Sequence, residues 1–273
     1  MSEIEQIKIY GERNTGTHFI NDLIAKNFVV PLLPSSPETM HPRKKKVIAA
    51  RERFLSHVRK NGQQLYRHVV ADRYNDLANR RYLPKTFGWK HTLPPLDFLE
   101  TRSAARQTLF VIIVKHPIYW GLSFHRRPYH SYFPVQNMEF GEFIRHLFIP
   151  TGRDNVDVPI YESIIDLYAA KVDGYRRLID AGFPAELVRY EELIADVSGF
   201  LRRLSEGYAL ERNSEEESVR EKNMKKGDDA TLTDFRAKYQ LDKVTEAVSP
   251  EDYEFIMSRF GADRLAWLGY PPA

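Results

Sequence analysis

The apolar residues near the N-terminus change their period after a short glycine-bearing stretch. Ile7 and Ile9 alternate with polar neighbours, residues 11–16 interrupt the pattern, and apolar residues then recur at helical spacing at Phe19, Ile20, Leu23, Ile24 and Phe28. Alternation is typical of a strand, and a spacing of three and four residues is typical of an amphipathic helix. The pattern therefore predicts a strand, a tight turn and a helix, in that order.

One apolar run is the least ambiguous element of the chain. Residues 109–114 read Leu-Phe-Val-Ile-Ile-Val, with no polar residue and with several β-branched ones. A strand that is buried on both faces has this composition, so the run predicts a central strand of a parallel sheet. Pro117 follows it and suits the first turn of a helix through Ser123, because its fixed φ and missing N–H cost nothing there.

Two weaker patterns predict further strands. Residues 187–190 read Leu-Val-Arg-Tyr and predict a short third strand. Residues 86–91 read Thr-Phe-Gly-Trp-Lys-His and lead to a Pro94-Pro95 stop, which suits a strand that ends at the rim of the sheet. We therefore expect several strands, distributed along the chain rather than clustered.

Helical patterns lie between and after these strands. Apolar residues near one face predict a long helix over 161–181, and another helix is expected to begin at Ser249-Pro250 and to end at Gly261. Strands that alternate with helices predict an α/β fold with a central, mostly parallel sheet and helices on both faces.

Three segments modify this plan of a single domain over residues 1–273. The Pro- and Ser-rich stretch 31–42 and the charged, weakly helical stretch 47–79 predict a helical or loop insertion at about 31–84. Residues 211–229 are highly charged and almost free of apolar residues. A flexible lid at about 211–230 is therefore expected, either mobile or ordered by a ligand.

Composition limits the classes of function. The 273 residues, 42% apolar and 12% aromatic, can bury a full core, and a net charge of +3 does not mark a nucleic-acid partner, so any anion site must be local. The absence of cysteine excludes disulfides, Cys-ligated zinc, iron–sulfur clusters and thiolate nucleophiles. The polar, acidic N-terminus and the lack of a run of about 18 apolar residues predict no membrane span and a cytoplasmic location.

The turn between the first strand and the first helix is a candidate anion site. It reads Gly-Glu-Arg-Asn-Thr-Gly-Thr-His over residues 11–18. A glycine-bearing loop that enters a helix presents unpaired backbone N–H groups and the positive end of the helix dipole, which bind phosphate or sulfate oxygens. The alternative is a tight turn without a ligand.

A second candidate site begins where the run 109–114 ends. Lys115 lies at the expected carboxyl end of the strand, and Ser123 follows about two helical turns later. Ligands of open α/β sheets bind at the carboxyl ends of the strands, so this cation and this hydroxyl are able to share one phosphate. The alternative is a cation that neutralises the end of a strand beside a surface serine.

The order of these segments resembles that of the sulfotransferases that use phosphoadenosine phosphosulfate (PAPS) as donor. The Gly-Glu-Arg-Asn-x-Gly-Thr form of the first loop is similar to bacterial-type members, and residues 115–123 resemble a basic-x-Pro-x5-Ser segment. Further matches are Lys90-His91-Thr92-Leu93-Pro94, Leu187-Val188-Arg189-Tyr190-Glu191-Glu192-Leu193, Asn223-Met224-Lys225-Lys226-Gly227 and Leu268-Gly269-Tyr270.

The resemblance implies a P-loop NTPase-like sulfotransferase fold and transfer of a sulfuryl group from PAPS to a hydroxyl of a glycan or small molecule. The product is adenosine 3′,5′-bisphosphate, and no metal is expected. The first loop would bind the 5′-phosphosulfate, through Gly11, Arg13, Asn14, Thr15, Gly16, Thr17 and His18. The rest of the nucleotide, with its 3′-phosphate, would be bound by Lys115, Ser123, Tyr190, Lys225, Lys226 and Gly227.

The catalytic groups implied by the resemblance are His91, Lys90 and Arg13. An imidazole is suited to accept the proton of the acceptor hydroxyl, since its ordinary pKa lies near neutrality. Arg13, with the N–H groups of the loop, would stabilise the leaving phosphate, and Lys90 is a second candidate for that role. Because the histidine follows the lysine directly here, either His91 or Lys90 is expected to face the acceptor.

Two departures from the family pattern affect the expected donor site. Asn14 stands where many members have lysine, so the nearest cation of the loop is Arg13. Lys115 stands where arginine is usual, which replaces a two-pronged fork by a point charge and weakens recognition of the 3′-phosphate.

Two other classes of function share part of this pattern. A nucleotide-dependent kinase on a related P-loop fold needs a loop lysine followed by Ser or Thr, which residues 11–18 lack. A non-catalytic protein that binds phosphate or polyanions needs no base at His91.

Overall fold

The core of the protein is a three-stranded parallel sheet. The computed structural model describes residues 3–35, 64–128, 138–221 and 229–271, with only the backbone described for 64–72 and 74. The strand order is β1-β2-β3, with β1 (Gln6–Tyr10), β2 (Thr108–Val114) and β3 (Ala185–Arg189). Both pairs are parallel, which confirms the expected parallel sheet with residues 109–114 at its centre.

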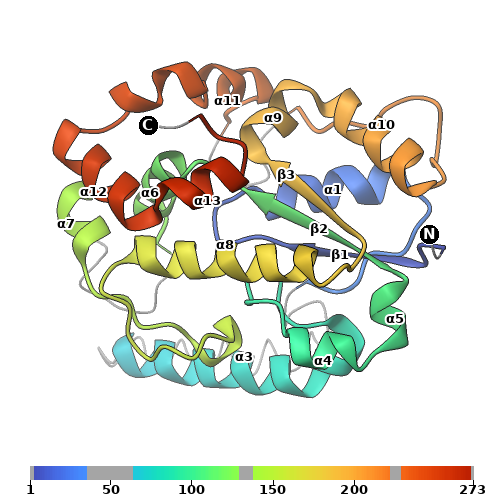
Figure 1. Cartoon of the computed structure of the whole chain (residues 1–273), viewed down its shortest axis with the longest axis horizontal. Coiled ribbons are helices and arrows are strands. Elements are labelled where there is room, and N and C mark those ends of the chain that lie inside the picture. The colour runs from blue at the N-terminus through green and yellow to red at the C-terminus, as the bar shows by residue number, and fades with distance from the viewer. Residues whose placement is uncertain (1–2, 36–63, 129–137, 222–228, 272–273) are drawn as a thin grey trace.

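Helices surround this sheet. In Figure 1, α1, α9 and α10 lie on one side of the strands, and α8, with α3 beyond it, lies on the other. The helices are α1 (Thr17–Asn27), α3 (Gln64–Thr86), α4 (Leu96–Glu100), α5 (Ser103–Arg106), α6 (Pro117–Arg126), α7 (Phe140–Arg145), α8 (Ile164–Asp180), α9 (Tyr190–Ala195), α10 (Val197–Tyr208), α11 (Leu232–Lys238), α12 (Pro250–Phe260) and α13 (Ala262–Trp267).

Local sequence explains the best-predicted elements. Every residue of β2 is buried, as expected of a strand that is apolar from Leu109 onward and lies between two neighbours. Pro117 begins α6 and Pro250 begins α12, where a missing N–H is tolerated. The side chain of Ser249 accepts a hydrogen bond from the N–H of Asp252, which caps α12. The helix predicted over 161–181 is confirmed as α8.

The strand predicted over residues 86–91 is wrong. Thr86 is the last residue of α3, and Phe87 and Gly88 then adopt positive φ values of 54° and 90°, which are incompatible with a strand. The carbonyl oxygens of Phe87 and Gly88 accept hydrogen bonds from the Tyr10 hydroxyl and Lys8 Nζ. The segment is therefore a turn that is fastened to β1 by side chains.

The predicted insertion and lid lie partly in the described chain. Residues 211–221 contain no helix and run beside the end of α1, where Asn27 exchanges two hydrogen bonds of 2.9 Å with the backbone of Ser218. The helix α3 begins within the range of the predicted insertion and ends two residues beyond it, at Thr86. The single domain, the insertion at 31–84 and the lid at 211–230 stay predictions. Within the described ranges, no helix is long and apolar enough to cross a membrane.

Candidate functional site

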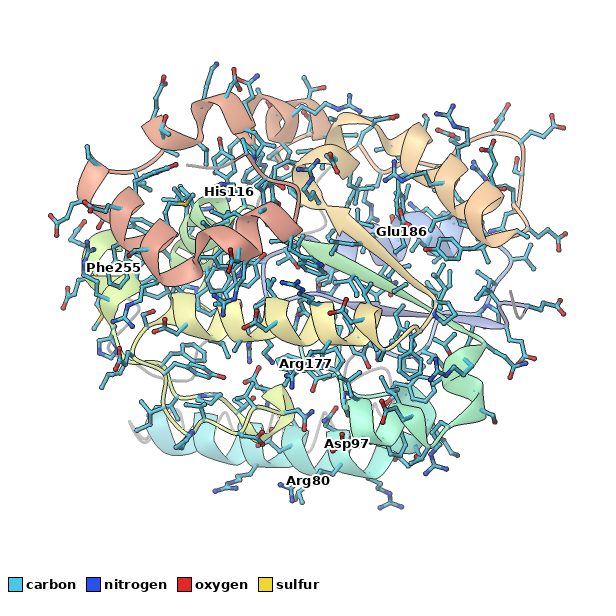
Figure 2. All side chains as sticks on the ribbon, in the orientation of Figure 1. Arg80, Asp97, His116, Arg177, Glu186 and Phe255 are labelled. Atoms are coloured by element: carbon cyan, nitrogen blue, oxygen red, sulfur yellow. The ribbon has the colours of Figure 1, made fainter. Side chains whose placement is uncertain are left out.

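The carboxyl ends of the three strands place the first part of the site. Gly11 follows β1, Lys115 follows β2 and Tyr190 follows β3. Parallel strands end at one edge of the sheet, so these residues meet although they are far apart in sequence. In Figure 1 the arrowhead of β2 points toward the side of the molecule where α6, α11 and α13 lie. Figure 2 shows His116, which follows Lys115, in the interior of the molecule, whereas Arg80 extends from α3 into solvent.

The loop 11–16 is tight because two positions admit only glycine. A Cβ on Gly11 would lie 2.6 Å from the Ile113 carbonyl oxygen. Gly16 has a φ of 101°, and a Cβ there would lie 2.5 Å from the ring of Tyr190. The loop therefore packs directly against β2 and against the residue that follows β3.

Backbone N–H groups at the start of α1 are available to bind an anion. Gly16 is the N-cap residue and provides no side-chain cap. The N–H of Thr15 donates to the Glu12 carbonyl at 3.2 Å, whereas those of Gly16 and Thr17 have no acceptor within the described part of the chain. Free N–H groups at the positive end of an 11-residue helix are suited to bind sulfate or phosphate oxygens.

His91 lies beside this loop. Its Nδ1 is 2.5 Å from the carbonyl oxygen of Gly11, and the N–H of Gly11 donates to the Lys90 carbonyl at 2.9 Å. A carbonyl accepts only, so Nδ1 carries the proton and Nε2 is left with its lone pair. None of the described groups hydrogen-bonds to Nε2. The ring is therefore in the tautomer that a general base requires.

Electrostatics keep His91 neutral. Burial lowers the pKa of His91 well below its ordinary value of 6.5, and the charges of Lys90 and Arg13 lower it further. The edge of the ring contacts Trp89 at a centroid distance of 4.7 Å. The imidazole is therefore unprotonated at neutral pH and able to accept a proton.

This low pKa predicts the pH dependence of any reaction that uses His91 as base. The active form persists until the pH falls to the lowered pKa, so kcat/KM is expected to stay constant from about pH 7.5 to about pH 6. The unfolded chain protonates this ring near 6.5 and the folded chain does not, so the free energy of unfolding falls as the pH drops below 6.5. Circular dichroism at each pH controls for unfolding. A loss of kcat/KM centred at pH 6.5, with the fold intact, would contradict the assignment.

Lys90 points toward the start of α1. Its Nζ is 3.1 Å from Nε2 of His18, so the protonated amine donates to that ring. The backbone of Lys90 is held on both sides, because its N–H donates to Ser35 and its carbonyl accepts from Gly11. The structure thus brings together four of the predicted residues, Gly11, His18, Lys90 and His91.

Arg13 lies in a buried cluster of charges. Its guanidinium binds both oxygens of Asp154, at 3.0 and 3.1 Å, and Glu12 at 2.7 Å. Although burial acts in the opposite direction, Arg13 and Lys171 hold the pKa of Asp154 well below its ordinary range. Because the N–H groups of Arg13 bind two carboxylates, this arrangement favours a role for Arg13 in shaping the loop. The contact of Arg13 with PAPS stays a prediction.

Lys171 and Asp154 are site residues that sequence reasoning missed. Lys171 Nζ donates to the carbonyl oxygens of His91 and Asp154, both at 2.7 Å, and is 3.2 Å from the Asp154 carboxylate. The lysine therefore links the backbone of His91 to the charged cluster of Arg13, Glu12 and Asp154. Its signal was present in the sequence, because Lys171 shares the buried face of α8 with Tyr168 and Tyr175.

A second cluster surrounds Lys115. Its Nζ lies 4.0 Å from the ring centroid of Tyr190 and 4.3 Å from that of Tyr239, and the residue is only 3% exposed. Ser123 Oγ is 3.2 Å from the hydroxyl of the same Tyr239. The structure therefore gathers Lys115, Ser123 and Tyr190 around one tyrosine, which the sequence had not indicated.

The two clusters form one continuous site. The ring of Tyr190 packs against Gly16 on one side and covers Lys115 Nζ on the other. None of the described carboxylates forms an ion pair with Lys115. Burial lowers the pKa of Lys115, and Tyr239 and Glu191 oppose this shift. A buried cation without an anionic partner is costly unless a ligand supplies the negative charge.

The remaining predicted residues are Asn14 and three residues of the late basic segment. Asn14 adopts a positive φ of 67°, and its side-chain amide donates to the Arg127 carbonyl at 3.4 Å. Lys225, Lys226 and Gly227 lie outside the described residues. The part of the chain that the structure describes holds no group of three or more side chains suited to bind a metal ion.

Comparison with known proteins identifies no relative. No family model, no curated protein and no solved structure matches the chain.

Proposed function

We propose that the chain is a PAPS-dependent sulfotransferase with the P-loop-like fold of that family. The observation that carries the proposal is the pairing of two anion sites at one edge of the sheet, with a neutral histidine beside the first. Free N–H groups of Gly16 and Thr17 suit the phosphosulfate, and the ammonium of Lys115, which forms no ion pair with a described carboxylate, suits a further phosphate. Tyr190 contacts both sites and would complete the nucleotide site.

The chemistry is an in-line transfer of a sulfuryl group. His91 Nε2 takes the proton of the acceptor hydroxyl as its oxygen forms a bond to sulfur. The bond between sulfur and the bridging oxygen breaks, and its electron pair stays on the 5′-phosphate of adenosine 3′,5′-bisphosphate. Lys90 and the N–H groups at the start of α1 stabilise this charge, as in phosphoryl transfer, where positioning and electrostatics supply most of the catalysis.

The remaining parts of the proposal concern acceptor and location. The acceptor is a hydroxyl of a glycan or of a small molecule, and the enzyme acts in the cytoplasm. Incubation with sulfur-35-labelled PAPS and a mixture of glycans and phenols tests the activity directly. Labelled product and adenosine 3′,5′-bisphosphate should form together. Absence of turnover with every acceptor, water included, would contradict the proposal.

The Lys115 site makes a separate prediction about binding. Adenosine 3′,5′-bisphosphate should bind about tenfold or more tightly than AMP, because hydrogen bonds to charged groups contribute about 1.5–3 kcal/mol. Lys115→Met should remove most of this difference, and the exposed Lys243→Met should leave it unchanged. Isothermal titration calorimetry measures all of these affinities. Equal affinity of the wild-type protein for the two nucleotides would exclude a 3′-phosphate site at Lys115.

A further inference from the structure

Tyr239 lies between the two side chains assigned to the 3′-phosphate. Its hydroxyl is 3.2 Å from Ser123 Oγ, and its ring centroid is 4.3 Å from Lys115 Nζ. Ser123 has one proton and donates it to the Tyr119 carbonyl at 2.7 Å, so the Tyr239 hydroxyl is the donor toward Ser123. The Tyr239 side chain also hydrogen-bonds to Lys115. A phosphate oxygen shared by Ser123 and Lys115 would therefore take the place of this hydroxyl, and Ser123 would turn its proton from the Tyr119 carbonyl to the phosphate.

Packing, and not this hydrogen bond, holds the ring of Tyr239. The residue follows α11 and is 6% exposed. Its ring makes edge contacts with Tyr119 and Tyr190, at centroid distances of 5.3 Å each, and stacks on Phe235 at 6.1 Å. The next residue, Gln240, accepts a hydrogen bond from the Tyr119 hydroxyl. None of these contacts needs the Tyr239 hydroxyl, so a phenylalanine would keep them.

The charges around Tyr239 also indicate that its hydroxyl interacts with Lys115. Burial acts to raise the pKa of Tyr239, but the charge of Lys115, with those of the nearby Lys238 and Arg126, lowers it overall. The phenol oxygen therefore faces Lys115 from the residue that follows α11, and it stabilises the ammonium in the absence of a carboxylate ion pair. An arriving phosphate with two negative charges is a stronger partner for the same ammonium.

We propose that Tyr239 is a specificity-determining residue of the nucleotide site, whose hydroxyl competes with the 3′-phosphate for Lys115 and Ser123. A nucleotide that carries a 3′-phosphate displaces the hydroxyl, and a nucleotide without one leaves it in place. This inference rests on the proposed function, because it assumes that Lys115 and Ser123 receive that phosphate. In addition, the Tyr239 hydroxyl occupies the 3′-phosphate position in the free protein, and only a strong anion displaces it.

Tyr239→Phe tests the competition because it removes the oxygen and keeps the ring. Titration calorimetry with adenosine 3′,5′-bisphosphate should show binding about two- to tenfold tighter than in the wild-type protein, the equivalent of one net hydrogen bond. The affinity for AMP should not change. Tyr253→Phe on α12 is the matched control, since the Tyr253 hydroxyl makes no hydrogen bond within the described residues. It should alter neither affinity.

The outcomes separate this inference from the proposed function. If the wild-type protein binds the bisphosphate and Tyr239→Phe binds it equally or more weakly, the inference is overturned and the proposed function stands. If neither protein binds the bisphosphate, both fail. Nuclear magnetic resonance of ring-labelled tyrosine adds a readout that a purely structural role would not move. The resonance that is lost in Tyr239→Phe should shift in the wild-type protein when the bisphosphate is added, but not when AMP is added.

Discussion

Substitution of Asp154 by alanine should lower the free energy of unfolding by about 3–5 kcal/mol, because it leaves buried cations without a partner. The carboxylate is fully buried. It accepts hydrogen bonds from both terminal nitrogens of Arg13, from Lys171, and from the backbone and side chain of Thr151. Glu12 would then be the remaining carboxylate near Arg13 and Lys171, at 2.7 and 3.9 Å.

A matched control for Asp154 exists on α8. Asp173 also binds an arginine through both oxygens, with two contacts of 2.7 Å to Arg264, but its side chain is 45% exposed. Asp173→Ala should therefore cost no more than about 1 kcal/mol. Urea denaturation of the two variants measures the difference. Similar small losses for both would show that burial does not decide the strength of the Asp154 cluster.

Substitution of His91 by asparagine should reduce sulfate transfer by about 10²–10⁴-fold, the range typical of a lost general base. The amide nitrogen of asparagine is able to take the place of Nδ1 and donate to the Gly11 carbonyl, while nothing replaces the basic Nε2. The loop should therefore keep its shape, and the affinity for adenosine 3′,5′-bisphosphate should change little. The rate of release of this nucleotide from PAPS, with and without a hydroxyl acceptor, is the measurement.

The alternative role of His91 is a purely structural hydrogen bond. In that case His91→Asn would retain activity and only His91→Ala would lose it. His146, the residue that follows α7, provides the control, and His146→Asn should behave as the wild-type protein does. Full activity of His91→Asn would remove the histidine from the proposed mechanism, and the amine of Lys90 would then be the group to test.

Local sequence was sufficient for much of the fold. The strand at 109–114, the helix behind Pro117 and the helix between Ser249 and Gly261 were all predicted, because periodicity and caps depend on neighbours within one or two turns. The prediction of a strand at 86–91 was wrong because local sequence does not show distant contacts. Side chains of β1, from Lys8 and Tyr10, hold this turn after the preceding helix, and they lie about 80 residues away in sequence.

In the candidate site, too, some features follow from the sequence and others only from the tertiary structure. The sequence alone determined where a glycine-bearing turn begins a helix, at Gly11–His18, and that a cation follows the central strand, at Lys115. Only the tertiary structure decided which charges meet. Asp154 reaches Arg13 across 141 residues of sequence, and Ser123 reaches Tyr239 across 116. Partners of this kind follow from how strands and helices pack in space, and no local pattern of residues carries that information.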